Sequence, residues 1–188
     1  MRSAATDYRQ GQRRLESTMM SSDDVLEVIN LLESAGVNVW INGGWGVDAL
    51  LGMQTRVHDD LDVYILSDHI TASQEALHPL GFELMTDDLP QGFVLRDAND
   101  RRVDFHPLVL QPDGSGVQHQ QEGGQWVLPA TVFQGSGRIW RTRVRCTTPE
   151  DQVRNHLGYE PDQIDFRDMR LLRDRFGLEL PPPFDLMG

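Results

Sequence analysis

The chain has 188 residues, of which 39% are hydrophobic and 24% are charged, and its formal net charge is −12. This length permits one domain with a buried core, and the composition excludes a disordered or fibrous protein. An acidic surface repels polyanions, so a nucleic acid is disfavoured as a partner and a small or cationic molecule is preferred.

Residues 1–20 contain several arginines but lack the apolar stretch of a signal peptide, so we expect a flexible N-terminal tail. No apolar run approaches the roughly 18 residues of a membrane-spanning helix, which argues against a membrane protein. Cys146 is the only cysteine, so an internal disulfide and a cysteine-based zinc cluster are excluded. Together these features predict a cytoplasmic protein.

The first elements alternate between helix and strand. Ser21 to Asp24 provide an N-cap and acidic first turn, apolar residues follow at helical spacing, and Gly36 ends the predicted helix. Residues 37–41 are predicted to form a buried strand that ends at Gly43-Gly44, residues 45–51 a short helix, and residues 60–66 a second strand.

The remainder combines hairpins with helices. We expect a helix at 68–80, strands at 82–85, 93–96 and 101–110, with a turn at 97–100, further strands at 125–128 and 138–146, and C-terminal helices beginning at Pro149 and Ile164. The turn at 97–100 makes its two strands antiparallel. This mixture predicts an α/β (α+β) fold, with a mixed β-sheet flanked by helices and with C-terminal helices.

Acidic residues recur on two of these strands. Alternation places Asp60 and Asp62 on one face, and Asp104 shares a face with Arg102 and His106 on the later strand. Carboxylate oxygens suit Mg²⁺ beside a triphosphate, and an isolated Asp within an apolar strand is costly unless it is paired or binds a metal. A solvated acidic turn remains the alternative for residues 59–62.

The diglycine bend could hold an anion. Gly43 and Gly44 let backbone amides approach a phosphate, and the N-terminus of the next helix adds partial positive charge. Arg56 could neutralise phosphate charge, although a surface arginine is an equal alternative. A plain strand-to-helix turn would also explain the two glycines, and the alternating arginines at 138–145 are best explained as the solvated face of a strand.

Gly44-Trp45-Gly46-Val47-Asp48-Ala49 also fits the dinucleotide fingerprint G-x-G-x-x-A after a strand. A Rossmann oxidoreductase is therefore a competing hypothesis. The following helix is short for a crossover, two aligned aspartates stand where one would suffice, and hairpins replace the parallel units that should continue.

The chain resembles the nucleotidyltransferase superfamily of DNA polymerase β, in its small antibiotic-modifying branch. The resemblance rests on Gly43-Gly44-Trp45-Gly46-Val47-Asp48, on Arg56-x-His58-x-Asp60-Leu61-Asp62 and on Asp104, and it runs from about Asp23 to Arg170. Within this branch the chain is most similar to lincosamide nucleotidyltransferases, through Val103 to Pro107, Asp113 to Ser115, Glu122 to Gly124, Cys146 and Asn155 to Tyr159.

The resemblance implies an Mg²⁺-dependent nucleotidyltransferase that moves a nucleoside monophosphate, usually AMP from ATP, to a hydroxyl of a small molecule. Two Mg²⁺ ions are expected on Asp60, Asp62 and Asp104, with Asp104 as a metal ligand or as the base. Gly43, Gly44, Trp45, Arg56 and Arg167 would bind the nucleotide. Many members of the superfamily carry Gly-Ser where this chain has Gly43-Gly44, so one phosphate contact is in doubt.

The acceptor stays open at this point. A lincosamide is the first candidate, with an aminoglycoside or another metabolite as alternatives, and a non-catalytic nucleotide-binding or toxin-antitoxin module is a third hypothesis. His106 and Glu122 are candidate walls of the acceptor pocket. The resemblance also implies a homodimer. We expect a nucleotidyltransferase catalytic domain at 21–147 and a C-terminal helical segment at 148–188 packed on it.

Overall fold

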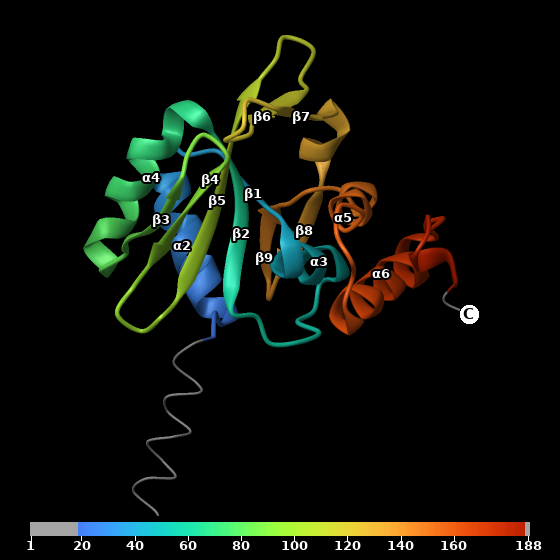
Figure 1. The fold of residues 1–188 in the computed structure, drawn as a ribbon. Helices are drawn as coiled ribbons and strands as arrows, with labels where there is room; N and C mark the ends of the chain where they lie inside the picture. The colour runs from blue at the N-terminus through green and yellow to red at the C-terminus, as the bar shows by residue number, and fades with distance from the viewer. Residues whose placement is uncertain (1–18, 187–188) are drawn as a thin grey trace, which may run out of the picture.

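The computed structural model describes residues 19–186, which form one mixed sheet, a separate β-hairpin and flanking helices (Figure 1). This arrangement confirms the predicted α+β fold with C-terminal helices. The strands are β1 Val39–Ile41, β2 Asp60–Leu66, β3 Glu83–Asp88, β4 Gly92–Arg96, β5 Arg102–Leu110, β6 Gly116–His119, β7 Gln125–Leu128, β8 Ser136–Ile139 and β9 Thr142–Arg145. The helices are α2 Ser22–Ser34, α3 Gly43–Leu51, α4 Ile70–Leu77, α5 Pro149–Asn155 and α6 Gln163–Phe176, with short 3-10 turns at Ser67–His69, His78–Leu80, Ala130–Gln134 and Phe184–Leu186.

The seven-stranded sheet runs in the order β1-β2-β5-β4-β3, and β6 pairs with both β5 and β7. Strands β2 and β5 are parallel neighbours, whereas the other pairs in the sheet are antiparallel. The parallel pair needs a long connection, which residues 67–101 provide by way of α4, β3 and β4. The acids predicted on 60–66 and 101–110 therefore lie on adjacent strands in the middle of the sheet.

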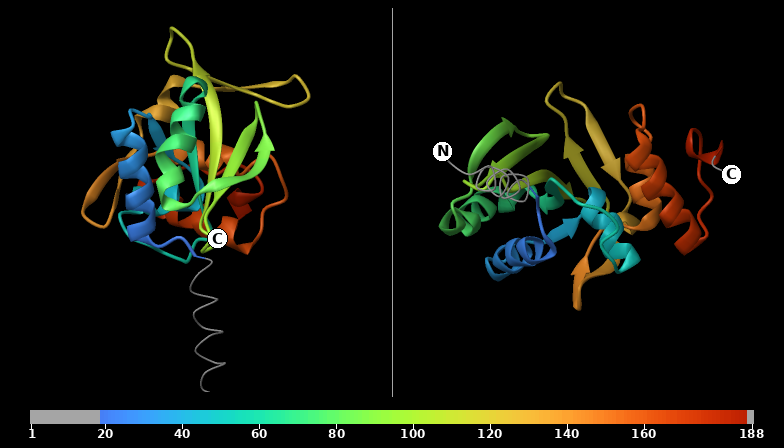
Figure 2. Two further views of the ribbon diagram at one scale, coloured as in Figure 1. Left: turned by 90° about the vertical axis from the view of Figure 1, so that its left-hand side faces the viewer. Right: turned by 90° about the horizontal axis from the view of Figure 1, so that it is seen from below.

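Helices α2 and α4 cover one face of the sheet, and α3, α5 and α6 lie on the other side (Figure 1; Figure 2 gives two further views). The covered face holds the main core, because the odd-numbered positions of β2 and β5 are apolar and fully buried: Leu61, Val63, Ile65, Val103 and Phe105. The same period of two places the aspartates on the opposite face.

Both the N-terminal cap and the apolar face of α2 favour a helix. Ser21 and Asp24 make a capping box in which each side chain accepts the other residue's backbone N–H, and Asp23 and Asp24 are acidic residues in the first turn. Val25, Val28, Ile29 and Leu32 face the core at helical spacing. The predicted start and apolar face of this helix are confirmed.

A second apolar cluster joins the C-terminal helices to α3. It is built from Val47, Val153, Met169, Leu172 and Phe184, all of which are buried. Phe166 and Phe184 meet edge to face, with ring centroids 5.2 Å apart. The helices after residue 148 thus pack directly on α3, the helix that begins with the two glycines.

Some predicted boundaries need correction. The single strand expected at 138–146 is the two-stranded hairpin β8–β9, whose ladder turns at Trp140-Arg141. Strand β6 was not predicted, and the helix expected at 68–80 is α4 with a 3-10 turn at each end. Helix α3 begins at Gly43, so the two glycines form its first turn and do not precede it.

Most of the N-terminal tail predicted at 1–20 lies outside the described residues. Met20, at its end, is 1% exposed and donates its N–H to the carbonyl of His58 at 2.9 Å. Among residues 19–186, no helix is both long enough and apolar enough to cross a membrane.

Candidate active site

The two acidic strands meet in register. Strand β2 pairs with β5 so that Asp62 lies opposite Asp104, and Tyr64 lies opposite His106. Since side chains alternate across a strand, these residues and Asp60 share the face that α2 and α4 leave open. The sheet therefore brings together acids that are 42 positions apart by the register of a parallel pair.

Three side chains converge closely enough to share one ion. Asp62, Asp104 and His106 each present a ligand atom, and these atoms all lie within 4.8 Å of one another. His106 Nε2 is 3.6 Å from Asp62 Oδ1 and 3.9 Å from Asp104 Oδ1. All three residues are half-buried, so the group is reachable from solvent.

Burial and mutual repulsion set the charges of this group. Burial, together with the negative charges of Asp62 and Asp60, raises the pKa of Asp104 to about 6, although His106 opposes this shift. Burial and the Asp62 carboxylate also raise the pKa of Asp60. Burial alone would lower the pKa of His106, but the neighbouring carboxylates of Asp62, Asp104 and Asp60 raise it.

Asp60 is exposed at the start of β2, two residues before Asp62. Its carboxylate is close enough to influence Asp104 but does not belong to the compact group of three. Arg102, its neighbour on β5, contributes a positive charge that favours the ionised carboxylate of Asp60. The predicted acid triad is thus assembled as a close pair, Asp62 and Asp104, with Asp60 beside it.

Gly43 allows the first turn of α3 to approach Asp62. Its φ is +56°, a backbone conformation that favours glycine, and a Cβ at this position would coincide with the Asp62 carboxylate. The cap residue Asn42 donates its N–H to the carbonyl of Asp62 at 2.9 Å. The N-terminus of α3 and the acids are therefore two walls of the same site.

Arg56 occupies the space beside Gly44. A Cβ on Gly44 would overlap Nη2 of Arg56 and would lie 2.5 Å from Nδ1 of His58. Arg56 Nε donates to Asp168 Oδ2 at 3.1 Å, and Nη1 donates to the carbonyl of Val57 at 3.2 Å. In this chain a guanidinium therefore lies where a side chain at position 44 would otherwise sit.

His58 and Asp48 form a buried pair next to the first turn of α3. His58 Nε2 and Asp48 Oδ2 are 2.5 Å apart, and both side chains are 2% exposed. Asp48 also accepts the backbone N–H and the hydroxyl of Thr55, at 3.0 and 2.7 Å. These contacts fix the loop between α3 and β2, so His58 acts as a support for the bend.

Other predicted residues lie further from the acids. Arg167 donates to the carbonyl of Thr55 and lies 3.8 Å from Asp168, which places it on the loop of Arg56. The indole of Trp45 is buried in the main core against His58, with ring centroids 4.6 Å apart. Glu122 is exposed in the β6–β7 turn and makes no ion pair with any described residue.

Sequence reasoning missed a polar wall that faces the acids. Tyr64 shares their face and contacts His106, with ring centroids 5.6 Å apart. Asn42 accepts hydrogen bonds from Thr147 Oγ1 and Asn155 Nδ2, both at 3.2 Å. The alternation of β2 could have identified Tyr64, whereas no local signal ties Asn42 to the distant α5.

This arrangement can bind a divalent cation. Within residues 19–186, neither Asp62 nor Asp104 is paired with an arginine, so their charges are compensated only by His106. Carboxylate oxygens are the ligands that Mg²⁺ prefers. A helix N-terminus and a guanidinium adjoin the acids, so an anion could be held next to such a cation.

The sheet order excludes the dinucleotide hypothesis. A Rossmann unit needs parallel strands on either side of its glycine turn, but β1 and β2 are antiparallel. Gly46 contacts Gln152 of α5, where a Cβ would overlap the amide nitrogen, so its lack of a side chain serves helix packing.

Comparisons with known proteins agree with this geometry. Residues 24–172 match the family model described as aminoglycoside-2''-adenylyltransferase. A lincosamide resistance protein from Staphylococcus haemolyticus is 28% identical over 159 residues, which cover 85% of this chain and 98% of that protein. A 2''-aminoglycoside nucleotidyltransferase from Klebsiella pneumoniae is 31% identical over 133 residues, 71% of each chain.

Solved structures resemble the whole fold. A crystal structure of a lincosamide antibiotic adenylyltransferase with bound lincomycin superposes with a TM-score of 0.75 at 28% identity, over 82% of this chain and 98% of that one. A 2''-aminoglycoside adenylyltransferase in complex with adenylyl-2''-tobramycin gives 0.65 at 22% identity, over 82% and 88%, and shares the fold. The chain therefore belongs to the aminoglycoside-2''-adenylyltransferase family and is a nucleotidyltransferase of the antibiotic-modifying branch.

Proposed function

We propose that this enzyme transfers AMP from ATP to a hydroxyl of a lincosamide. In this reaction the acceptor oxygen forms a bond to the α-phosphorus, the bond from that phosphorus to pyrophosphate breaks, and the hydroxyl proton goes to a base. The observation that carries the proposal is the register of β2 and β5, which sets Asp62 opposite Asp104 beside the first turn of α3.

Asp60, Asp62 and Asp104 would hold Mg²⁺, with two ions as our proposal. When bound, Mg²⁺ neutralises the charge of the triphosphate and lowers the pKa of the acceptor hydroxyl. The fit rests on the donor set, because Asp62 and Asp104 offer carboxylate oxygens that no described arginine neutralises. The acids also lie on rigid central strands, which favours precise positioning.

Asp104 would act either as a ligand of Mg²⁺ or as the base that removes the hydroxyl proton. Without a bound metal, burial and the carboxylates of Asp62 and Asp60 raise its pKa to about 6, which leaves it ionised at neutral pH and makes it a stronger base than an ordinary aspartate. His106 lies 3.9 Å from Asp104 Oδ1 and would stabilise the carboxylate between turnovers. We place the acceptor hydroxyl near these two residues, where it can reach both the base and the α-phosphorus.

The phosphates would bind along the first turn of α3. The backbone N–H groups of Gly43 and Gly44 have no partner within the helix, Gly43 lies against the Asp62 carboxylate, and the helix end adds partial positive charge. Arg56 would contribute a cation beside Gly44, in place of the serine hydroxyl of other members. Arg167 and the backbone of Trp45 would complete this binding surface from α6 and α3.

The share of each relative that aligns with this chain favours a lincosamide over an aminoglycoside as the acceptor. The lincosamide resistance protein aligns over 98% of its own length, and the lincomycin-bound structure gives the TM-score of 0.75. The aminoglycoside hypothesis is supported by the family description and by 31% identity over 71% of that relative. In either case His106 and Glu122 are proposed as acceptor-pocket residues, with a small hydroxylated molecule as the acceptor.

A pyrophosphate-release screen tests the proposal. ATP, GTP, CTP and UTP are combined with lincomycin, clindamycin and several aminoglycosides including tobramycin, with Mg²⁺ present. We expect ATP with a lincosamide to give pyrophosphate and a product heavier by one adenylyl group in mass spectrometry. Transfer only to aminoglycosides would replace the acceptor, and nucleotide binding without any pyrophosphate would favour the non-catalytic module.

We further propose a catalytic domain at 21–147, a packed helical segment at 148–188, a homodimer, and a cytoplasmic location where ATP is available. The contact between α6 and the loop of Arg56 supports the packing of the C-terminal helical segment, because Asp168 and Arg167 hold Arg56 and Thr55. Sedimentation of the purified protein tests the dimer.

A further inference from the structure

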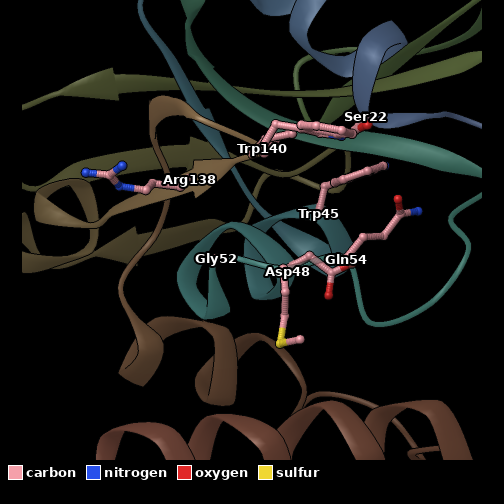
Figure 3. Close-up of a pocket in the computed structure, with 9 residues that line it drawn as sticks. Ser22, Trp45, Asp48, Gly52, Gln54, Arg138 and Trp140 are labelled. Atoms are coloured by element: carbon pink, nitrogen blue, oxygen red, sulfur yellow. The ribbon is translucent and has the colours of Figure 1, made fainter.

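Two adjoining hollows lie beside α3 and meet at Gly52, at the opposite end of this helix from the acids. One, of about 210 Å³, is lined by Trp45, Met53, Gln54 and Trp140 (Figure 3). The other, of about 350 Å³, is lined by Arg138, Arg143 and Arg175 together with backbone of α3 and β8. Gly52 and Arg138 line both hollows, so the two adjoin, and we refer to them together as the depression.

The three arginines of the larger hollow lack acidic partners. None makes an ion pair with a carboxylate in the described part of the chain, although that chain is strongly acidic overall. Arg143 Nε donates to Ser136 Oγ at 2.8 Å, and the guanidinium carbon of Arg175 lies 5.5 Å from the centroid of the Phe176 ring. Guanidinium groups gathered in one hollow repel one another, so they favour a bound anion.

Trp140, which lines the smaller hollow, has an exposed side chain and a strained backbone conformation. Trp140 is 72% exposed and begins the two-residue loop of the β8–β9 hairpin, with a φ of +55°. Glycine is common at such a position, because a bulky side chain there is strained. Strain of this kind is a reason to look for a function of the side chain.

A buried polar group also faces this region. The indole N–H of Trp45 is buried and has no hydrogen-bond acceptor among the described residues. Gln54 and Ser22, which line the same hollow, offer an amide and a hydroxyl. The hollow thus combines an aromatic surface with hydrogen-bonding groups, as the recognition of a planar heterocycle requires.

We propose that this depression is a second nucleotide-binding site, separate from the acidic site. The phosphates would contact Arg138, Arg143 and Arg175, whose planar guanidinium groups suit phosphate oxygens. The base would stack on Trp140. Helix α3 has nine residues and is therefore about 13 Å long, so Leu51, which lines the arginine-rich hollow, lies about that far from Gly43 beside the acids.

Binding of ADP measured by calorimetry in EDTA tests this site. Without a divalent ion the acids repel phosphates, so we expect the remaining binding to report on the depression. The double variant Arg138→Gln/Arg143→Gln should bind ADP at least roughly tenfold more weakly. Arg141→Gln is the matched control, because Arg141 is exposed on the same hairpin but lines neither hollow, and it should bind like the wild type.

Trp140→Gly separates binding from folding. Glycine relieves the positive φ, so this variant should have a higher Tm and yet bind ADP roughly tenfold more weakly. Adenosine and pyrophosphate, which each lack one half of the ligand, should both bind more weakly than ADP.

Three results would overturn the proposal. They are an absence of ADP binding by the wild type in EDTA, equal affinities for the double variant and Arg141→Gln, and loss of binding in Asp62→Asn with retention in the arginine variants. If the double variant instead changes the molar mass in sedimentation and leaves ADP affinity intact, the surface is a contact between copies of the chain.

Discussion

The two ends of α3 lie beside side chains of opposite charge. At its N-terminus Gly43 lies against the carboxylate of Asp62, and at its C-terminus Gly52 adjoins Arg138. A helix has partial positive charge at its N-terminus and partial negative charge at its C-terminus, so both placements are favourable by about 0.3–1 kcal/mol. The net charge of −12 therefore describes neither end of the helix, because acidic and basic side chains gather at different ends.

Replacing Asp62 tests the acidic end most strongly. Asp62→Asn removes one carboxylate of the close pair, and we expect turnover to fall about a thousandfold, since a metal contribution of several kcal/mol is lost. Pyrophosphate release with ATP and the acceptor measures this loss. Asp59→Asn is the matched control, because Asp59 is exposed and precedes β2; similar activities for the two variants would contradict the site assignment.

Gly43→Ala tests whether the helix end and the acids act together. The added Cβ would overlap the Asp62 carboxylate, and the positive φ adds strain, so we expect about a hundredfold lower turnover and about 1–3 kcal/mol lower stability. Gly36→Ala is a useful control, because Gly36 also has a positive φ but nothing lies within 4 Å of its Cβ. Equal turnover in the two variants would separate α3 from the acids.

Asp48→Asn tests the buried pair of Asp48 and His58 at the middle of α3. The change breaks the buried pair with His58, so we expect a loss of about 3 kcal/mol in unfolding free energy. Chemical denaturation measures the loss. Because Asp48 does not contact the acids, turnover per folded molecule should change much less than in Asp62→Asn; the opposite ranking would assign the pair a direct part in the reaction.

The smallest expected effect concerns Asp104 in the metal-free protein. Its folded pKa of about 6 exceeds the ordinary value of 3.8, so the folded state binds more protons between these values and loses stability as the pH rises through them. Asp104→Asn removes this loss and should be more stable than the wild type by about 1 kcal/mol at neutral pH, after a discount for solvent screening. Denaturation in EDTA should show the difference above about pH 6 and its disappearance below about pH 4.

Much of the fold follows from local patterns in the sequence. The capping residues of α2 and the strict alternation of β2 predicted both elements, and strand β2 has the predicted bounds. The hairpin β8–β9 was missed because Trp140 and Arg141 do not form a glycine or asparagine turn. Strand β6 was missed because Gly116 to His119 is short and polar in alternate positions.

The candidate site was predictable only where it depends on one strand at a time. Alternation placed Asp60 with Asp62, and Asp104 with His106, on shared faces. The sequence could not show that Arg56 fills the space beside Gly44, because Asp168, which holds it, lies 112 positions away. Arg138 and Arg143 were predicted to lie on the solvated face of a strand, because the sequence could not show that Arg175, from a distant helix, lines the same hollow.

The parallel pairing of β2 with β5 makes catalysis a sensitive indicator of correct folding. A shift of one residue between these strands would turn Asp104 into the apolar core and would leave the helical content nearly unchanged. A preparation with normal circular dichroism and no turnover would therefore point to mispaired strands as readily as to chemical damage. Refolding yield for this enzyme is best judged by activity per molecule.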